Sequence, residues 1–337
     1  MKRMKGIYSA LISTICLVIL ILDTETAITG AANGIDLCLR SILPSLFPFC
    51  LLTKLICSPM LGKRIPIMQY IGTLTGIPQG AESILLLSFI GGYPIGAQCI
   101  DDAYQSRTIS GRDAARMLAF CNNAGPAFLF GILGCLFPTT LPLWSLYIIH
   151  ILSAVLVGIL LPGKSVDMCS LRPKATLTLS QALESSIKTI ASVCGWIIVF
   201  RIILQFAERW LFGALGPAGQ ATVAGLLELS NGCIALSQVK SMGLRYILCS
   251  LFLAFGGCCI CMQTAAVARH IEYKLYLPGK VLQASLSVFL TLITQHLIFS
   301  SNEVYPVIGI GALFLAIGGI FCVIILVKKK KVVAIAK

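Results

Sequence analysis

The stretch "SFIGGYPIGAQCI" (88–100), followed by "MLAFCNNAGPAFLFGILG" (117–134), interrupts two apolar segments with glycine, proline and asparagine. The second half of the chain repeats this arrangement in "ELSNGCIALSQV" (228–239) and "CSLFLAFGGCCICMQT" (249–264). An unpaired backbone N–H or C=O costs several kcal/mol in hydrocarbon, so a membrane tolerates a broken helix only against protein or a wet cavity. Paired interruptions in two halves of a chain are typical of a transporter site near the middle of the bilayer.

The composition around these stretches is that of a membrane protein. Of 337 residues, 57% are hydrophobic and 12% are charged, whereas soluble domains carry about 25% charged residues. The mean hydropathy is +0.92, and the apolar runs approach the roughly 20 residues that cross a bilayer. We therefore predict an all-α, polytopic membrane protein whose main partner is the lipid bilayer.

The net charge of +13 also raises a nucleic-acid interpretation, but the basic residues lie mainly between apolar runs and in 328–331 after the last run. This placement favours cytoplasmic loops and a lipid-facing tail over nucleic-acid binding. Most of the fifteen cysteines lie within apolar runs, without paired CxxC motifs or nearby histidines. We expect free thiols, no metal site and no cofactor.

The apolar runs predict about eight transmembrane helices and two re-entrant hairpins. The basic, apolar N-terminus could be a cleaved signal peptide, but Asp23 and Glu25 follow it closely and favour a retained first span. The predicted spans are 7–22, 37–57, 113–136, 142–161, 183–204, 244–267, 281–299 and 305–327, and the predicted hairpins are 82–106 and 217–239.

The basic residues orient this topology. With both termini in the cytoplasm, most Lys and Arg residues, including Lys274 and Lys280, fall in inside loops, and few fall outside. The stretch "QSRTISGRDAAR" (105–116) is predicted to be a solvated cytoplasmic connector. Reading either hairpin as a full crossing would move several basic loops outward and weaken the asymmetry.

The two halves follow the same order. "SILPSLFPFCLL" (41–52) resembles "SIKTIASVCGWII" (186–198), and a hairpin, a broken helix and a final span follow each. Each unit has three full crossings, an odd number, so the copies lie in opposite orientations and form an inverted repeat. The predicted organisation is a span and connector (1–34), repeat 1 (35–162), a cytoplasmic linker (163–180), repeat 2 (181–300), and a last span with a basic tail (301–337).

The first hairpin contains Gly91, Gly92 and Pro94, which break the helix because glycine permits tight turns and proline lacks an N–H. Glu82 opens this hairpin. A carboxylate within a membrane segment is a candidate binding group. An equally weighted alternative places Glu82 at the membrane interface, where it caps the start of a helix.

The motif "FCNNAGPAF" (120–128) is the sharpest local signal. Asn122 and Asn123 supply amide donors and acceptors beside Gly125 and Pro126, which free backbone groups. This combination favours the lining of a site for a polar solute or a cation. The alternative is a kink whose freed groups the asparagines satisfy locally.

The second half offers Glu228, Asn231 and Gly232 at its hairpin tip, and Gly256, Gly257 and Gln263 in its broken helix. Glu228 lies deep in an apolar run, where it could carry a proton or bind Na⁺ together with freed carbonyls. The alternative is a neutral, hydrogen-bonded structural glutamate. Either H⁺ or Na⁺ could therefore couple transport.

The stretch from "GGYPIGAQCIDD" to "NNAGPAF" (91–128) resembles the YlbJ-type sporulation integral membrane proteins, within the nucleoside-recognition or Gate domain group, and "FGGCCICMQ" (255–263) resembles an element of their second half. The resemblance implies a plasma-membrane protein of a spore-former, needed for the spore envelope or cortex. The group is also similar in layout to concentrative nucleoside transporters. We do not carry nucleoside specificity across, because Glu82 and Glu228 match the acidic positions of those transporters only loosely.

The leading hypothesis is a secondary transporter or exporter of a small polar solute, held between two hairpin tips and two broken helices. The runner-up is a non-transporting membrane scaffold or signalling protein of envelope assembly. An enzyme is not expected, because no nucleophile–base pair, HExxH, GxSxG or P-loop motif is present. The sequence is compatible with a homo-oligomer.

Overall fold

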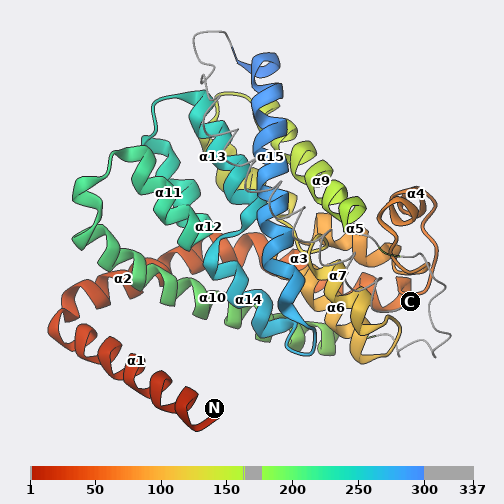
Figure 1. The fold of residues 1–337 in the computed structure, drawn as a ribbon, viewed down its shortest axis with the longest axis horizontal. Coiled ribbons are helices and arrows are strands. Elements are labelled where there is room, and N and C mark those ends of the chain that lie inside the picture. The colour runs from red at the N-terminus through yellow and green to blue at the C-terminus, as the bar shows by residue number, and fades with distance from the viewer. Residues whose placement is uncertain (1, 162, 164–176, 300–337) are drawn as a thin grey trace, which may run out of the picture.

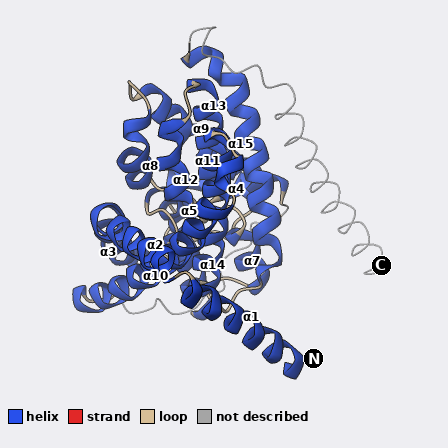
Figure 2. Cartoon of the chain, turned by 90° about the vertical axis from the view of Figure 1, so that its left-hand side faces the viewer, coloured by secondary structure: helices blue, strands red, loops and turns tan. Residues whose placement is uncertain are grey.

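The computed structural model describes residues 2–161, 163 and 177–299. Within these ranges every regular element is a helix (Figures 1 and 2), so the predicted all-α fold is confirmed. Five helical segments of the described chain are long and apolar enough to cross a membrane: 24–57, 141–160, 179–210, 242–267 and 273–298. The predicted span 305–327 and the basic tail lie outside the described residues, as does most of the linker.

One predicted span is divided at the interruption that the sequence predicts within it. The stretch 113–136 divides into α7 (Gly111–Leu118) and α8 (Pro126–Ile132), because Gly125 is extended and Pro126 begins a new helix. The stretch 7–22 lies in α1 (Lys2–Leu22), a continuous helix of 21 residues. The other five predicted spans between 37 and 299 overlap the five candidate membrane-spanning segments of the described chain.

A long helical pair lies across the upright helices of the molecule (Figure 1). It consists of α2 (Thr24–Leu37), continued through a π-helical turn (Cys38–Ile42) into α3 (Leu43–Met60), and of α10 (Leu179–Trp210). Helices α2 and α10 touch along their backbones: a Cβ atom on Gly30 would lie 2.8 Å from Ile202 Cα, and one on Gly34 would lie 2.9 Å from Ile198 Cα. This GxxxG spacing lets two helices approach closely, as in many membrane helix pairs.

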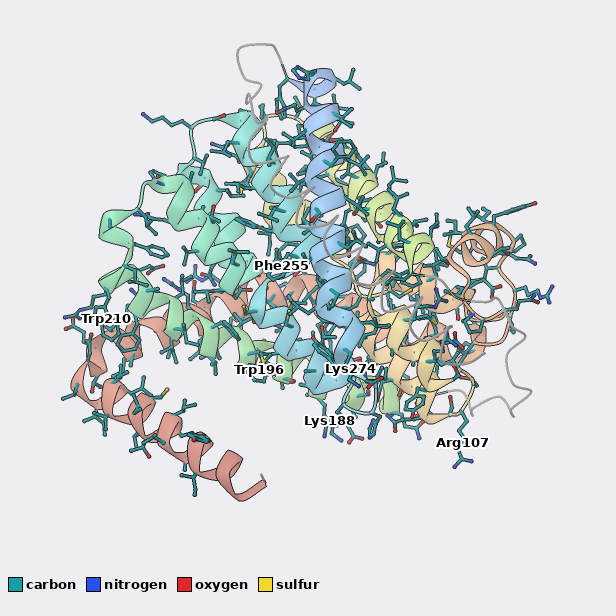
Figure 3. All side chains as sticks on the ribbon, in the orientation of Figure 1. Arg107, Lys188, Trp196, Trp210, Phe255 and Lys274 are labelled. Atoms are coloured by element: carbon teal, nitrogen blue, oxygen red, sulfur yellow. The ribbon has the colours of Figure 1, made fainter. Side chains whose placement is uncertain are left out.

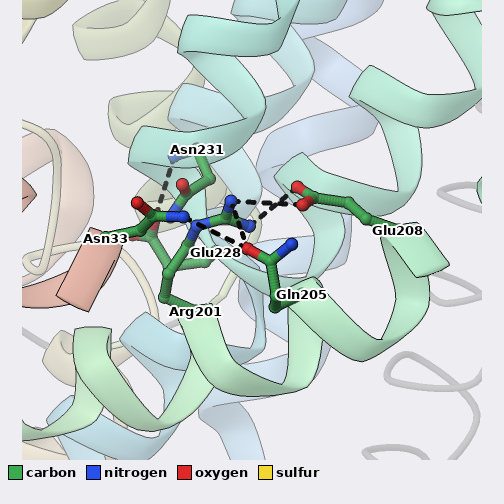
Figure 4. Close-up of polar contacts among 6 residues, drawn as sticks. All are labelled: Asn33, Arg201, Gln205, Glu208, Glu228 and Asn231. Carbon is green, nitrogen blue, oxygen red and sulfur yellow. Dashed lines mark hydrogen bonds and ion pairs between the residues drawn. The ribbon is translucent and has the colours of Figure 1, made fainter. Parts of the chain in front are cut away.

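Polar contacts flank this seam (Figure 4). Asn33 Nδ2 on α2 donates to Gln205 Oε1 on α10 at 3.2 Å, and Arg201 bonds both Gln205 and Glu208 along α10. At one end of the pair, Arg209 reaches Asp23 at 3.1 Å. The close backbone contact and these bonds together fix α2 on α10.

The upright part of the fold is built on α9 (Leu141–Leu160), α13 (Met242–Phe255) and α15 (Tyr276–Ile298), which all contact one another. Hydroxyl groups link α13 to α15: Ser250 Oγ lies 2.8 Å from Ser287 Oγ and 2.7 Å from Thr291 Oγ1. Large apolar side chains such as Ile148 and Leu297 remain exposed on the outside, as expected of a lipid-facing surface.

Each half contains a helix–turn–helix followed by a broken helix. The first half has α5 (Glu82–Ile90) with α6 (Ile95–Gln105), then α7 and α8; the second half has α11 (Pro217–Leu227) with α12 (Leu229–Ala235), then α13 and α14 (Gly257–Val267). The halves also cross-contact in a matching way, α6 with α14 and α12 with α8. The order of elements is as predicted, and the inverted relation between the halves and the domain boundaries stay predictions.

The remaining described elements are short connectors, namely α4 (Pro66–Thr75) and four 3₁₀ turns (Leu133–Leu136, Phe212–Ala214, Leu236–Gln238 and Tyr273–Leu275). Basic side chains that include Arg107, Lys188 and Lys274 lie along one edge of the molecule in Figure 3. That this edge faces the cytoplasm stays a prediction.

The prediction that 105–116 is a solvated connector is wrong for Arg116, the last residue of the stretch. Arg116, on α7, is only 4% exposed and donates to the carbonyl oxygens of Thr75 and Gly76, each at 2.5 Å, and of Leu161 at 3.2 Å. Its guanidinium supplies five donors in a fixed geometry, which suits it to collecting chain-end carbonyls. The motif contains a structural arginine that binds three segments together.

The seam between α2 and α10 gives a test of the fold. Gly34→Leu is expected to destabilise the protein by about 1–3 kcal/mol, because the added side chain must displace the α10 backbone. A thermal unfolding midpoint of the purified protein measures the effect. The control is Gly195→Leu, on the same α10 helix, where an added Cβ meets nothing within 4 Å. Equal midpoints for the two variants would contradict the close packing of this seam.

Candidate functional site

Four interruptions of helical structure meet in the centre of the protein. We name them the first turn (91–94, between α5 and α6), the first break (119–125, between α7 and α8), the second turn (Glu228, between α11 and α12) and the second break (256–257, between α13 and α14). They are the places where the sequence predicts broken helices. The candidate site is the space that they enclose.

Within the first half, the first turn and the first break touch backbone to backbone. Gly92 has a φ of +81°, which glycine adopts without a steric penalty. A Cβ on Gly92 would lie 3.1 Å from Gly125 N, and one on Gly125 would lie 2.8 Å from Gly92 N. Pro94 and Pro126 stand at the starts of α6 and α8, where a missing N–H costs nothing.

The second half is built on a similar close approach. Gly256 has a φ of +82° and ends α13, and Gly257 lies against the end of α11, where an added Cβ would stand 2.9 Å from Gly225 O. Gly225 also faces Gly232 of α12, whose added Cβ would stand 2.1 Å from Gly225 Cα. The glycines therefore bring the second turn and the second break into contact.

A cleft lies where the two halves meet. Its walls come from the first turn, the first break, the second turn and α14, and residues of α3 and α10 close the side. The lining residues are Ile42, Leu46, Gly92, Tyr93, Ala124, Gly125, Phe128, Val193, Ile197, Glu228, Leu229, Ser230, Ile260 and Gln263. The volume that the centres of water molecules can occupy within the cleft is about 30 Å³. One water needs roughly 10–15 Å³ by this measure, so the cleft as it stands fits water or a small ion.

Glu228 is the charged residue of this lining, and it is 1% exposed. Its Oε1 accepts from Ser230 N at 3.1 Å, and its Oε2 accepts from Asn231 N and Asn231 Nδ2, each at 2.7 Å (Figure 4). Glu228 makes no ion pair within the described part of the chain. The carboxylate thus caps α12, and its remaining acceptor capacity faces the cleft.

Gln263, on α14, adds a second acceptor. Its Nε2 donates to Cys259 Sγ at 3.2 Å, whereas its Oε1 is buried without a hydrogen-bond partner among the described residues. A buried polar atom without a partner is costly and points to a missing one. Gln263 is 2% exposed and lines the cleft, so a ligand or water bound there would satisfy it.

Of the fourteen residues that the sequence predicts for the site, four line the cleft: Gly92, Gly125, Glu228 and Gln263. Gly91, Pro94, Pro126, Asn231, Gly232, Gly256 and Gly257 shape or support its walls. Glu82 lies elsewhere, at the start of α5, where its Oε2 accepts from Gly80 N at 2.7 Å. It is 2% exposed, so its role there is a buried contact with the turn before the helix.

The two asparagines of the first break are not among the residues that line the cleft, and their amides join helices. Asn122 Oδ1 accepts from Ala97 N at 3.3 Å, and its Nδ2 donates to Thr264 Oγ1 at 2.8 Å, so it connects α6 with α14. Asn123 Nδ2 donates to Phe120 O at 2.7 Å and thereby satisfies a carbonyl freed by the break. Both side chains are completely buried.

Sequence reasoning missed two buried groups beside the first break. Lys280, predicted in an inside loop, lies within α15 at 0% exposure. His150, on α9, accepts the Ala124 N–H through Nε2 at 3.0 Å, and its buried Nδ1 has no hydrogen-bond partner among the described residues. Position 280 lies at the edge of the apolar run, so the pattern of charges predicts a loop there. The spacing of Lys280 and Gln283, three residues apart on one helix face, is the sequence signal that could have indicated a buried polar pair.

Comparison with known proteins agrees with the sequence motifs. The chain is 22% identical over 330 aligned residues to the sporulation integral membrane protein YlbJ of Bacillus subtilis (strain 168), and the alignment covers 83% of this chain and 81% of that protein. A search of family profiles finds no match, and no solved structure matches. The resemblance to YlbJ-type sporulation integral membrane proteins is thereby confirmed as a similarity, and the described part of the chain has the helices of a polytopic membrane protein.

Proposed function

We propose that this protein is a secondary transporter or exporter of a small polar solute. The observation that carries the proposal is the cleft whose walls come from three of the four interruptions, together with α14, which follows the fourth. Interrupted helices at the interface of two repeats are where secondary transporters bind solutes and coupling ions. Because every wall belongs to one chain, the proposal does not require a homo-oligomer, and it assigns no catalytic role to any residue.

The chemistry of the cleft favours a ligand that donates hydrogen bonds or carries positive charge. Glu228 and Gln263 both present oxygen acceptors. The first N–H groups of α12, which could otherwise attract an anion, are already bound by the Glu228 carboxylate. H⁺ on Glu228, or Na⁺ beside it, is therefore the proposed coupling ion.

The size of the cleft bears on the transport cycle. The space of about 30 Å³ admits water or a small ion, so a larger solute enters only after the walls separate. The hairpins α5–α6 and α11–α12 are the elements proposed to move, because the turns of both line the cleft. Solute selectivity then depends on an open state, and the proposal includes no nucleoside specificity.

The biological setting of the proposal comes from the relative. YlbJ is described as a sporulation integral membrane protein, and we extend that setting to this chain: a multi-pass plasma-membrane protein with cytoplasmic termini that moves a solute during formation of the spore envelope or cortex. The basic edge that holds Arg107, Lys188 and Lys274 would then face the cytoplasm (Figure 3).

An uptake screen tests transport directly. The purified protein in proteoliposomes is expected to accumulate at least one small polar solute, preferably a cationic one, under a proton or sodium gradient. Glu228→Gln is expected to reduce the rate by about 10-fold or more, since a lost charged hydrogen-bond partner costs about 1.5–3 kcal/mol. If no solute in a broad panel moves, and Glu228→Gln still supports sporulation of the host, a scaffold or signalling role replaces this proposal.

A second prediction isolates Gln263. Gln263→Leu is expected to lower solute uptake and the count of heat-resistant spores by about 10-fold, because it removes a polar partner of the ligand while keeping an apolar wall. The control is Met262→Leu, its neighbour on α14, whose side chain is 40% exposed outside the cleft and whose replacement conserves volume. Both variants should reach the membrane in wild-type amounts. Equal activity of the two would remove Gln263 from the site.

A further inference from the structure

Lys280 is a fully buried lysine whose side-chain nitrogen lies among three neutral oxygen atoms. Its Nζ lies 2.8 Å from Gln283 Oε1, 3.1 Å from Tyr93 OH and 3.4 Å from Asn123 Oδ1. It also lies 5.0 Å from the centre of the Tyr93 ring, within the range of a cation–π contact. An ammonium group has three N–H donors, so these three acceptors use all of them.

The acceptors come from three different places. Tyr93 belongs to the first turn, Asn123 to the first break, and Gln283 to α15. The same Asn123 Oδ1 also accepts from Gln283 Nε2 at 2.9 Å, and Tyr93 OH lies 3.1 Å from Leu253 O on α13. Lys280 therefore links the first turn and the first break to α15.

The groups that face Lys280 include no carboxylate among the described residues. The ionisable neighbours are Tyr93 from the first turn, Cys121 from the first break, His150 from α9 and Cys261 from α14. Burying a charge without an opposite partner is costly, and proteins keep such a charge only where hydrogen bonds and function compensate. A lysine in this place therefore calls for a role.

We propose that the Lys280 ammonium is a built-in cation that fills, between the first turn and the first break, the place where a broken-helix transporter can bind a free monovalent cation. Three neutral oxygens from separate segments around one positive charge form such a site. Here the cation is covalently attached to α15 and cannot leave. The first half then binds no exchangeable Na⁺.

The transport consequence of this inference rests on the proposed function, whereas the cation site itself rests only on the contacts of Lys280. In the second half, Glu228 faces the cleft without an ion pair among the described residues. Any exchangeable coupling ion is then restricted to the second half. The two halves share an architecture but differ in their cation. In the first half the cation is part of the chain, whereas in the second half it would be exchangeable.

Chemical rescue tests the site without a transport assay. Lys280→Ala removes three methylenes and the ammonium, the equivalent of n-propylammonium. The thermal midpoint of the purified full-length variant is expected to fall below that of the wild type. With n-propylammonium chloride at ten times its Kd, the midpoint should rise by roughly 2 °C. Equal concentrations of choline chloride or of 1-propanol should not raise it, and the wild type should not respond.

Lys280→Met is the matched control, because methionine fills the space of the lysine side chain without supplying a charge. It is expected to be less stable than the wild type and to be insensitive to n-propylammonium. If Lys280→Met is as stable as the wild type, the ammonium has no structural role and the proposal fails. It also fails if n-propylammonium stabilises the wild type and Lys280→Ala equally.

A third measurement does not depend on the folding of any Lys280 variant. If the first half holds no exchangeable cation, Glu228→Gln should show the same thermal midpoint in NaCl and in choline chloride at equal ionic strength. Specific stabilisation of Glu228→Gln by Na⁺ would contradict the proposal. Rescue of Lys280→Ala together with a negative uptake screen would leave the built-in cation standing and reject the transporter.

Discussion

A membrane protein that breaks its helices must pair every backbone group that the breaks release. Hydrocarbon offers no partner, and each unpaired group costs several kcal/mol. In this protein the breaks lie against one another: Gly92 touches Gly125, and Gly257 touches the last carbonyls of α11. The absence of Cβ atoms at these contacts allows the backbones to meet, so the centre of the fold depends on glycine.

Side chains pair the groups that these contacts leave. His150 accepts the N–H of Ala124, Asn122 accepts that of Ala97, and Glu228 accepts those at the start of α12. Arginines collect carbonyl oxygens nearer the ends of the helices. Arg116 joins three segments in this way, and Arg245 binds Leu136 O at 2.6 Å and Val239 O at 2.7 Å. Most of the polar side chains buried near the breaks are thus used by the backbone.

The places where helices break could be predicted from the sequence, because glycine and proline act through local backbone geometry. Gly91 to Pro94 and Gly256–Gly257 interrupt helices where expected. The partners of the freed groups could not be predicted in the same way, because they depend on which helices meet in space. Asn122 and Asn123 have the composition of a ligand site, yet their amides connect helices and satisfy the break.

The location of Lys280 could not be predicted from the sequence either, because it too depends on which helices meet in space. A lysine at the edge of an apolar run is normally a loop residue, and the positive-inside pattern supports that assignment. The packing of α15 against the first turn and the first break is what buries its side chain. Likewise, the number of continuous spans depends on where α7 ends, which the hydropathy of 113–136 does not reveal.

The two halves differ in the balance of hydrogen-bond donors and acceptors around their breaks. Around the first break the amides, the histidine and the lysine together satisfy the freed groups, with His150 Nδ1 and Arg116 Nε as exceptions among the described side chains there. Beside the second turn a carboxylate and an unpartnered amide oxygen face a shared cleft. A protein gains nothing in stability from leaving Gln263 Oε1 buried and unpaired. The excess of acceptors is therefore best explained by a donor that arrives from outside the chain.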